Sequence, residues 1–350
     1  MGIALLAVAL LISLKTVVDS GEFKKIEPHF NGECQEITGL EGPEDIIILS
    51  DSIAIISSDP RRKTLSESTS LYSYESKEEH SHQGNIFLYN INNKKLTNMT
   101  TSLNFEFHPH GISSYLDING RTYVSAINHT TKGHSIEFFV IENNKLVFIK
   151  KIMDPALISP NDLVMVDENR FYVTNDHGSK TLTGKLMEDY LQLSRSNVLF
   201  YNGSSFIEVL GNMQYANGIN ISKDKNLIYV SETVGQEVSV YRRDLVTSKL
   251  TFENSIDINS GLDNIEIDNN GNLWIGSHPK LFDFVKHAKD ANHLSPSQVV
   301  MISSDDYSFK EIYLSNGDDL SGSSVATKIN NNLLIGAVFE EHFLHCYLNE

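Results

Sequence analysis

The chain of 350 residues has few cysteines, few basic residues and no long apolar segment. It has 28 Lys and Arg against 45 Asp and Glu, and so a formal net charge of −17. This charge argues against nucleic acid as a partner, because phosphate backbones are bound by basic surfaces. The same negative charge is compatible with bound cations. The remaining composition, 40% hydrophobic and 21% charged, is typical of a globular protein.

The longest apolar run lies near the N-terminus, from Ile3 to Leu14. It is too short to span a bilayer comfortably and has the length of a secretory h-region, although the usual basic flank is missing. Residues 1–20 are therefore predicted to be a signal or a retained anchor, and both alternatives stay open. Either one places the protein in the secretory pathway, extracellular or membrane-anchored on the lumenal or extracellular side. The segment also offers contact with a membrane or lipid particle.

Four N-x-[ST] sequons fit a secreted protein. Asn98, Asn128 and Asn202 are predicted glycosylation sites, whereas Asn220 lies inside an apolar strand pattern and is expected to be unmodified. The two cysteines, Cys34 and Cys346, lie near opposite ends of the chain. In an oxidising compartment they can form a disulfide, and two free thiols are the alternative. A bridge enclosing nearly the whole chain makes sense only if the fold closes on itself.

One pattern recurs along the chain: a polar residue, an aliphatic strand, a turn rich in Asp, Asn or Gly, and a second strand. The six modules begin at Glu44, His110, Asn161, Asn217, Asp263 and Ser323. Further strand candidates lie between them. Units of roughly 45–60 residues with about four strands each are typical of β-propeller blades. The sequence therefore predicts an all-β, six-bladed propeller over residues 21–350, a single domain closed by the Cys34–Cys346 bridge.

Two segments depart from the strand pattern. Residues 182–196 have the spacing of an amphipathic helix and are expected to form a lid over one mouth of the channel. Residues 60–83 are Ser-rich, charged and without periodicity, which predicts a long mobile loop. His80 and His82 in this loop are more simply read as solvated side chains than as metal ligands.

The polar residues that begin the modules are expected to converge, because the inner strands of a propeller line one channel. Glu44, Asn161, Asn217 and Asp263, with Asn264 beside the last, form an oxygen-rich set whose two acids balance one divalent ion. Such a set favours calcium over magnesium, which keeps its waters, and over zinc, which prefers His or Cys.

The second members of two doublets, Asp45 and Asp162, should point to the opposite face from Glu44 and Asn161. They predict a second, deeper calcium ion, to which the backbone carbonyl near Ile112 contributes. A simpler explanation for any single position is that Asp and Asn suit the turns that precede strands.

The motifs GPEDIII, HPHGIS, AINH, SPNDLV, TNDH, YANGINIS and LDNIEID, with the terminal cysteine pair, resemble those of the paraoxonases from Cys34 to Cys346. These are calcium-dependent arylesterases and lactonases with a six-bladed propeller. The resemblance implies two calcium ions. It implies a catalytic ion held by Glu44, Asn161, Asn217, Asp263 and Asn264, a structural ion held by Asp45, Asp162 and the carbonyl of Ile112, and a histidine pair formed by His110 and His129.

The expected function is hydrolysis of aryl esters or lactones, a carboxylic ester hydrolase activity with a small-molecule substrate. His110 is the expected base, since histidine titrates near neutral pH. His129 would orient it or relay the proton, and Asp263 is the competing base. Two other functions remain open: a membrane-anchored chaperone without catalytic activity, and a gluconolactonase-type propeller with a single metal.

Overall fold

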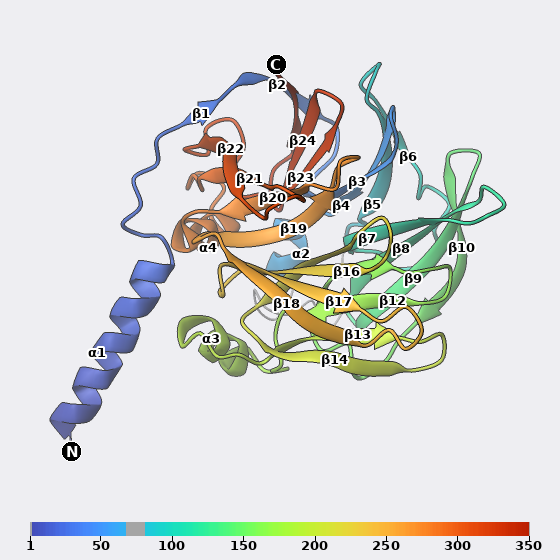
Figure 1. The fold of residues 1–350 in the computed structure, drawn as a ribbon. Helices are drawn as coiled ribbons and strands as arrows, with labels where there is room; N and C mark the ends of the chain where they lie inside the picture. The colour runs from blue at the N-terminus through green and yellow to red at the C-terminus, as the bar shows by residue number, and fades with distance from the viewer. Residues whose placement is uncertain (1, 68–80, 350) are drawn as a thin grey trace.

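Six antiparallel sheets surround a central axis in the computed structural model, which describes residues 2–67 and 81–349 (Figure 1). The inner strand of each sheet packs against the inner strand of the next, and β23 packs against β3 to close the ring. The inner strands are β3 (Pro43–Ser50), β7 (Pro109–Leu116), β11 (Pro160–Met165), β15 (Ala216–Ile221), β19 (Gly261–Ile267) and β23 (Ser323–Ile329). The predicted all-β, six-bladed propeller is therefore confirmed.

The other strands of each blade follow from the inside outward. The second strands are β4 (Ile53–Ser58), β8 (Thr122–Thr130), β12 (Phe171–Asn175), β16 (Leu227–Glu232), β20 (Leu273–His278) and β24 (Asn332–Ala337). The third strands are β5 (Asn85–Asn90), β9 (Gly133–Glu142), β13 (Ser196–Tyr201), β17 (Glu237–Arg243), β21 (Ser297–Ile302) and β25 (His342–Leu348). The outer strands are β6 (Lys95–Asn98), β10 (Lys145–Ile152), β14 (Phe206–Met213), β18 (Leu250–Asp257), β22 (Phe309–Ser315) and β2 (Gly32–Thr38).

The last blade contains strands from both ends of the chain. Its outer strand β2 comes from the N-terminal region and pairs with β25, in a register that sets Cys34 opposite Cys346. These residues form the predicted disulfide, with an S–S distance of 1.99 Å. The short strand β1 (His29–Phe30) pairs with β22 of the neighbouring blade. The N-terminal region thus joins two blades in addition to closing the ring.

The inner strand β3 shows why the aliphatic runs form such blades. Ile46 and Ile47 are both buried and face opposite sides of the strand. Ile46 packs in a cluster with Val325 of β23, and Ile47 packs in another with Ile112 of β7. Six hydrophobic clusters of this kind, each between two adjacent blades, make up the core.

All six inner strands have an irregular register against their second strand, close to their first residues. The residues that fall within these irregularities are Glu44, His110, Gly111, Asn161, Asp162, Asn217, Gly218, Asp263, Asn264 and Ser324. A bulge of this kind interrupts the alternation of side chains and redirects them. In the sixth module the residue so placed is Ser324, whereas Ser323, the predicted start, pairs with Ala337.

Four helices accompany the described part of the propeller: α1 (Gly2–Asp19), α2 (Arg61–Glu67), α3 (Leu182–Tyr190) and α4 (Leu281–Lys289). The helix predicted over 182–196 is thus confirmed for its first nine residues. The loop predicted over 60–83 requires correction at its start, where α2 forms, and residues 68–80, including His80, lie outside the described residues.

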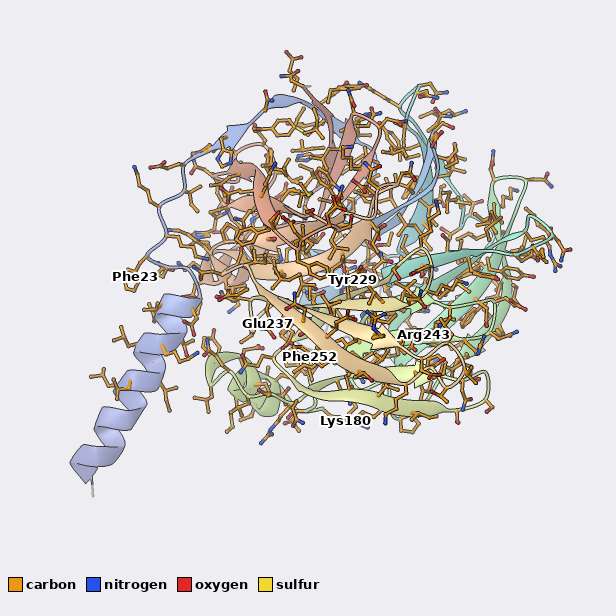
Figure 2. The ribbon with its side chains drawn as sticks, in the orientation of Figure 1. Phe23, Lys180, Tyr229, Glu237, Arg243 and Phe252 are labelled. Carbon is orange, nitrogen blue, oxygen red and sulfur yellow. A yellow bond between two sulfur atoms is a disulfide. The ribbon has the colours of Figure 1, made fainter. Side chains whose placement is uncertain are left out.

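The helix α1 extends away from the propeller (Figure 1). Its C-terminal end contacts the end of α3. Thr16 Oγ1 donates to the carbonyl of Tyr190 at 2.7 Å, and Gln192 donates to Asp19 at 2.8 Å. Phe23, just beyond the helix, is 71% exposed (Figure 2). Among residues 2–67 and 81–349, no helix is both long and apolar enough to cross a membrane.

The predicted glycosylation of Asn128 requires correction. This residue is fully buried in β8, its amide NH2 donates to the carbonyl of Glu106 and to Glu137, and its Oδ1 accepts from the amide of His108. A folded chain therefore has no room for a glycan there. Asn202 is exposed and Asn98 is partly exposed, so these two sites stay predictions.

Candidate active site and metal centre

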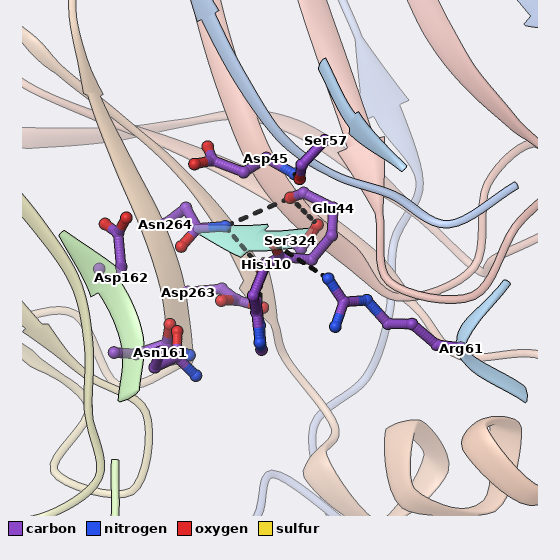
Figure 3. A network of polar contacts seen from close by, with 12 residues as sticks. Glu44, Asp45, Ser57, Arg61, His110, Asn161, Asp162, Asp263, Asn264 and Ser324 are labelled. Atoms are coloured by element: carbon purple, nitrogen blue, oxygen red, sulfur yellow. Dashed lines mark hydrogen bonds and ion pairs between the residues drawn. The ribbon is translucent and has the colours of Figure 1, made fainter. Parts of the chain in front are cut away.

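The bulged ends of the inner strands meet at one end of the channel, beneath a cavity of about 310 Å³. Six of the predicted site residues line this cavity: Glu44, His110, His129, Asn161, Asn217 and Asp263. Figure 3 shows most of the predicted cage converging from separate strands. The structure therefore brings together side chains that are more than 200 residues apart in sequence, as the contact between Asn264 and Glu44 illustrates, with a separation of 220.

The three asparagines of the cage are oriented alike. The amide NH2 groups donate to protein acceptors: that of Asn161 to Asp176 at 3.3 Å, that of Asn217 to Thr233 at 2.9 Å, and that of Asn264 to Glu44 at 2.8 Å. The three Oδ1 atoms are buried and accept no hydrogen bond from any described residue. Unsatisfied buried acceptors are costly, and carbonyl oxygens are the ligands that calcium prefers.

Two side chains, His110 and Arg61, lie against the carboxylate of Glu44. His110 Nε2 lies 3.3 Å from Glu44 Oε1, and the guanidinium of Arg61 lies 3.5 Å from Oε2. Burial by itself would raise the pKa of Glu44, but His110 and then Arg61 outweigh it and lower that pKa. Arg61 is 3% exposed and also donates to the carbonyl of Pro109. Sequence reasoning assigned Arg61 to a solvated loop and missed this role.

Asp263 is paired with a histidine rather than with another cage residue. Its Oδ2 lies 2.9 Å from His278 Nε2, and the His278 ring stacks on Phe284 with centroids 3.8 Å apart. Burial raises the pKa of Asp263, although the contact with His278 opposes this change. His278 therefore lies in the wall of the cavity and holds the Asp263 carboxyl in place.

The deeper pair, Asp45 and Asp162, does not line the cavity and is drawn above Glu44 and Asn161 in Figure 3. One oxygen of Asp45 accepts from the backbone amide of Ile112 at 2.7 Å, and one oxygen of Asp162 accepts from the amide of Ile219 at 2.7 Å. Burial raises the pKa of both carboxyls, and negative neighbours raise it further: Glu44 for Asp45, and Asp45 for Asp162. The contact seen at Ile112 is made by its N–H group, and the predicted role of its carbonyl stays a prediction.

No three His, Cys, Asp or Glu side chains of residues 2–67 and 81–349 are grouped in a way that could hold a metal ion by themselves. Of the predicted ligands, Glu44 and Asp263 are the acids that line the cavity and Asp45 and Asp162 are the acids that lie deeper, while the remaining side-chain oxygens belong to amides. This donor set does not suit zinc, whose sites use several His or Cys ligands. It suits calcium, which accepts mixed carboxylate and carbonyl oxygens.

The two predicted histidines are in contact at the edge of the cage. His110 Nδ1 lies 2.8 Å from His129 Nε2, so the opposite nitrogen of His110 faces Glu44. Burial, followed by the neighbouring His134 and His110, lowers the pKa of His129 well below its usual value. His110 thus has one nitrogen directed at the cage and one engaged by a neutral imidazole. That arrangement can accept a proton from the cage side.

The rest of the cavity wall is largely apolar and comes from the helices. Leu65 of α2, Leu186 of α3 and Phe282 of α4 line it, together with Phe339 from the last blade. Close to α3, His177 lies between Asp176 at 2.6 Å and Asp189 at 3.0 Å. Although burial opposes protonation, these two carboxylates raise the pKa of His177 to about 9. His177 is therefore a protonated part of the wall and not a base.

The Arylesterase family profile matches residues 22–348. The chain belongs to the arylesterase family. Serum paraoxonase/arylesterase 2 of Gallus gallus is 33% identical to it over 343 residues, covering 93% of this chain and 91% of the relative. Serum paraoxonase/arylesterase 1 of Homo sapiens is 31% identical, covering 93% and 91%. This membership supports a hydrolase of ester or lactone type.

Solved structures of other families share the arylesterase-family fold. A luciferin-regenerating enzyme matches with a TM-score of 0.55, 13% identity and coverage of 90% of this chain and 95% of that one. A gluconolactonase from Xanthomonas campestris matches with a TM-score of 0.51, 13% identity and coverage of 93% and 99%. At this identity the likeness concerns the propeller alone, so the site must be judged from its own residues.

Proposed function

We propose that this chain is a calcium-dependent hydrolase of aryl esters and lactones. The observation that carries the proposal is the arrangement of the three asparagines, whose buried Oδ1 atoms accept no hydrogen bond from the described residues. Asn161 and Asn217 line the same cavity as Glu44 and Asp263, and Asn264 donates to Glu44. Removing three carbonyl oxygens from water without a donor costs several kcal/mol, of the order of 1–3 for each. A bound cation offsets that cost, and the arylesterase family supports the reaction class.

The residues present fit two calcium ions. Glu44, Asn161, Asn217, Asp263 and Asn264 would hold the upper one, and Asp45, Asp162 and the carbonyl of Ile112 the deeper one. Each ion would offset two carboxylates. When bound, the upper calcium supplies Lewis-acid polarisation of the substrate carbonyl and stabilises the negative charge that develops on its oxygen.

His110 is the proposed general base. Its Nε2 faces the cage, 3.3 Å from Glu44 Oε1, and is placed to take a proton from the attacking water. Its Nδ1 is held by His129 at 2.8 Å, which fixes the ring. The hydroxide oxygen bonds to the carbonyl carbon, the ester C–O bond breaks, and the leaving oxygen takes the proton back from the histidines. Asp263 is the weaker candidate, since His278 occupies its Oδ2.

The apolar part of the cavity fits the organic portion of such a substrate. Leu186, Tyr190, Leu281 and Phe282 line this part of the cavity, and a space of about 310 Å³ accommodates an aryl ester or a small lactone. Burial of the apolar portion would exclude water from all but the cage side of the carbonyl.

The test is hydrolysis of phenyl acetate and a lactone panel by the purified protein, with calcium and with EDTA, combined with a metal count. We expect two calcium ions per chain and turnover that EDTA abolishes. Asp263→Ala should lose the upper ion and activity, while Asp51→Ala, at an exposed turn, should lose neither. Calcium-dependent folding without turnover would instead support the chaperone function, and one ion per chain would support a gluconolactonase-type site.

We also propose that the N-terminal segment contacts a membrane or lipid particle and that the protein enters the secretory pathway. Leu10 and Leu11 of α1 are 70% and 66% exposed, and the same helix reaches the cavity mouth through Thr16. Neutral phosphatidylcholine vesicles should retain the protein in a flotation assay, and Leu10→Ser with Leu11→Ser should release it. Equal flotation of both forms would refute the proposal.

A further inference from the structure

A third histidine continues the pair of imidazoles at the edge of the cage. His134 of β9 lies directly opposite His129 of β8 in the antiparallel ladder. Its Nδ1 is 2.7 Å from His129 Nδ1, and the two rings are nearly perpendicular, with centroids 4.7 Å apart. The three rings of His110, His129 and His134 therefore form one continuous hydrogen-bonded chain.

The two short N···N distances fix how protons are distributed along this chain. Each contact, at 2.8 and 2.7 Å, must share one proton, because two facing lone pairs would repel and two facing N–H groups would clash. A neutral imidazole carries one N–H. In the tautomer in which His110 Nε2 carries no hydrogen, His110 Nδ1 donates to His129, His129 Nδ1 donates to His134, and His134 Nε2 carries a hydrogen. Proton uptake at His110 Nε2 is therefore coupled to proton release at His134 Nε2.

His134 is the end of this series of imidazoles that faces the cavity. It lines the cavity, and its Nε2 has no hydrogen-bond partner among the described residues. Burial and the nearby Lys185 lower the pKa of His134 to about 4, while Asp176 acts in the opposite direction. A neutral ring at this position can pass a proton to cavity water and receive one back without retaining it.

We propose that His134 is a positioning residue that completes a three-imidazole proton relay for the hydrolysis assigned above, on which this inference rests. A proton taken from water by His110 Nε2 displaces the Nδ1 proton onto His129 Nε2, and the His129 Nδ1 proton moves onto His134 Nδ1. The Nε2 proton of His134 then enters the cavity water. The reverse transfer protonates the leaving oxygen and restores all three tautomers, so no proton is gained or lost.

The first test is His134→Phe, which keeps an aromatic ring but has no nitrogen. We expect kcat to fall about tenfold to a hundredfold, within the range of proton-transfer effects, with KM and calcium content unchanged. His345→Phe is the matched control, because His345 is also a buried imidazole with its pKa lowered to about 4 and is hydrogen-bonded to Tyr89 rather than to the cavity. Its kcat per folded molecule should equal that of the wild type.

Rescue separates a proton relay from simple packing. His134→Ala leaves space beside the cavity, and added imidazole should restore kcat in a concentration-dependent manner, whereas it should not affect His345→Ala. Wild-type kcat in His134→Phe would overturn the relay, and so would His134→Ala activity that imidazole does not restore.

A readout without substrate keeps this inference distinct from the proposed function. In calcium-loaded protein with 15N-labelled histidine, we expect two low-field ring N–H signals from the shared protons, and His134→Phe should remove the one shared with His129. If no substrate is hydrolysed but both signals are present, the proposed function fails while the imidazole chain stands. If the wild type is active and His134→Phe leaves both signals in place, the relay fails alone.

Discussion

The deeper acid pair gives the sharpest prediction, through the variant Asp162→Asn. This change removes a buried charge while keeping the shape of the side chain and its ability to accept from Ile219. In calcium, the variant should lose the deeper ion, which the pair Asp45 and Asp162 would hold. In EDTA, it should be no less stable than the wild type, because the wild type then retains an uncompensated buried carboxyl.

The expected change in melting temperature follows from the binding of one calcium ion at each of the two proposed sites. Calcium at about 100 times its dissociation constant stabilises the folded state by about 2.7 kcal/mol per site, so two sites give about 5.4 kcal/mol. The unfolding entropy of a 350-residue chain is about 0.7 kcal/mol per degree near the melting temperature. The wild type should therefore melt about 8 °C higher in calcium than in EDTA, and the variant only about 4 °C higher.

The pH dependence has a definite sign. Burial raises the pKa of Asp162 above its ordinary value of 3.8, so the folded, calcium-free protein holds a proton that the unfolded chain has released. Binding of this proton stabilises the folded state. The stabilisation is complete below pH 3.8 and is lost as pH rises through the raised pKa of Asp162 in the folded state. The calcium-free variant should lack this contribution.

Melting by circular dichroism in calcium and in EDTA, from pH 5 upward, measures these differences. Asp51→Asn, at an exposed turn, is the control and should behave as the wild type. The reasoning is refuted if Asp162→Asn keeps the full calcium response, or if it is clearly less stable than the wild type in EDTA.

Three further changes test the two proposed calcium sites and their surroundings. His110→Gln should reduce kcat by about 10²–10⁴ with calcium content unchanged, and undiminished turnover would exclude His110 as the base. In Gly111→Ala the new Cβ would lie 2.6 Å from Asp162 Oδ1, so calorimetry should show weaker calcium binding and denaturant melts a loss of about 1–3 kcal/mol. Arg61→Met leaves Glu44 with less compensation and should cost about 3–5 kcal/mol in EDTA but less in calcium; an equal loss in both would contradict the charge pairing.

The repeated modules made the propeller predictable, because each inner strand is buried on both sides. The run that contains Ile46 and Ile47 has no polar position along its middle, as a strand between two adjacent blades requires. Recurrence of the pattern six times then sets the number of blades. The polar residues at the starts of the strands could be placed on one ring for the same reason, without knowledge of any contact between them.

The sequence by itself thus determined the propeller, its closure by Cys34 and Cys346, and the chemical types gathered in its channel. Only the tertiary structure decided how they are used. Strict alternation would send Asp263 and Asn264 to opposite faces, but the bulge in β19 removes both from the regular ladder. The burial of Arg61 against Glu44 depends on packing between α2 and two blades. The reason is that register and packing depend on contacts between segments far apart in the chain, which no local pattern encodes.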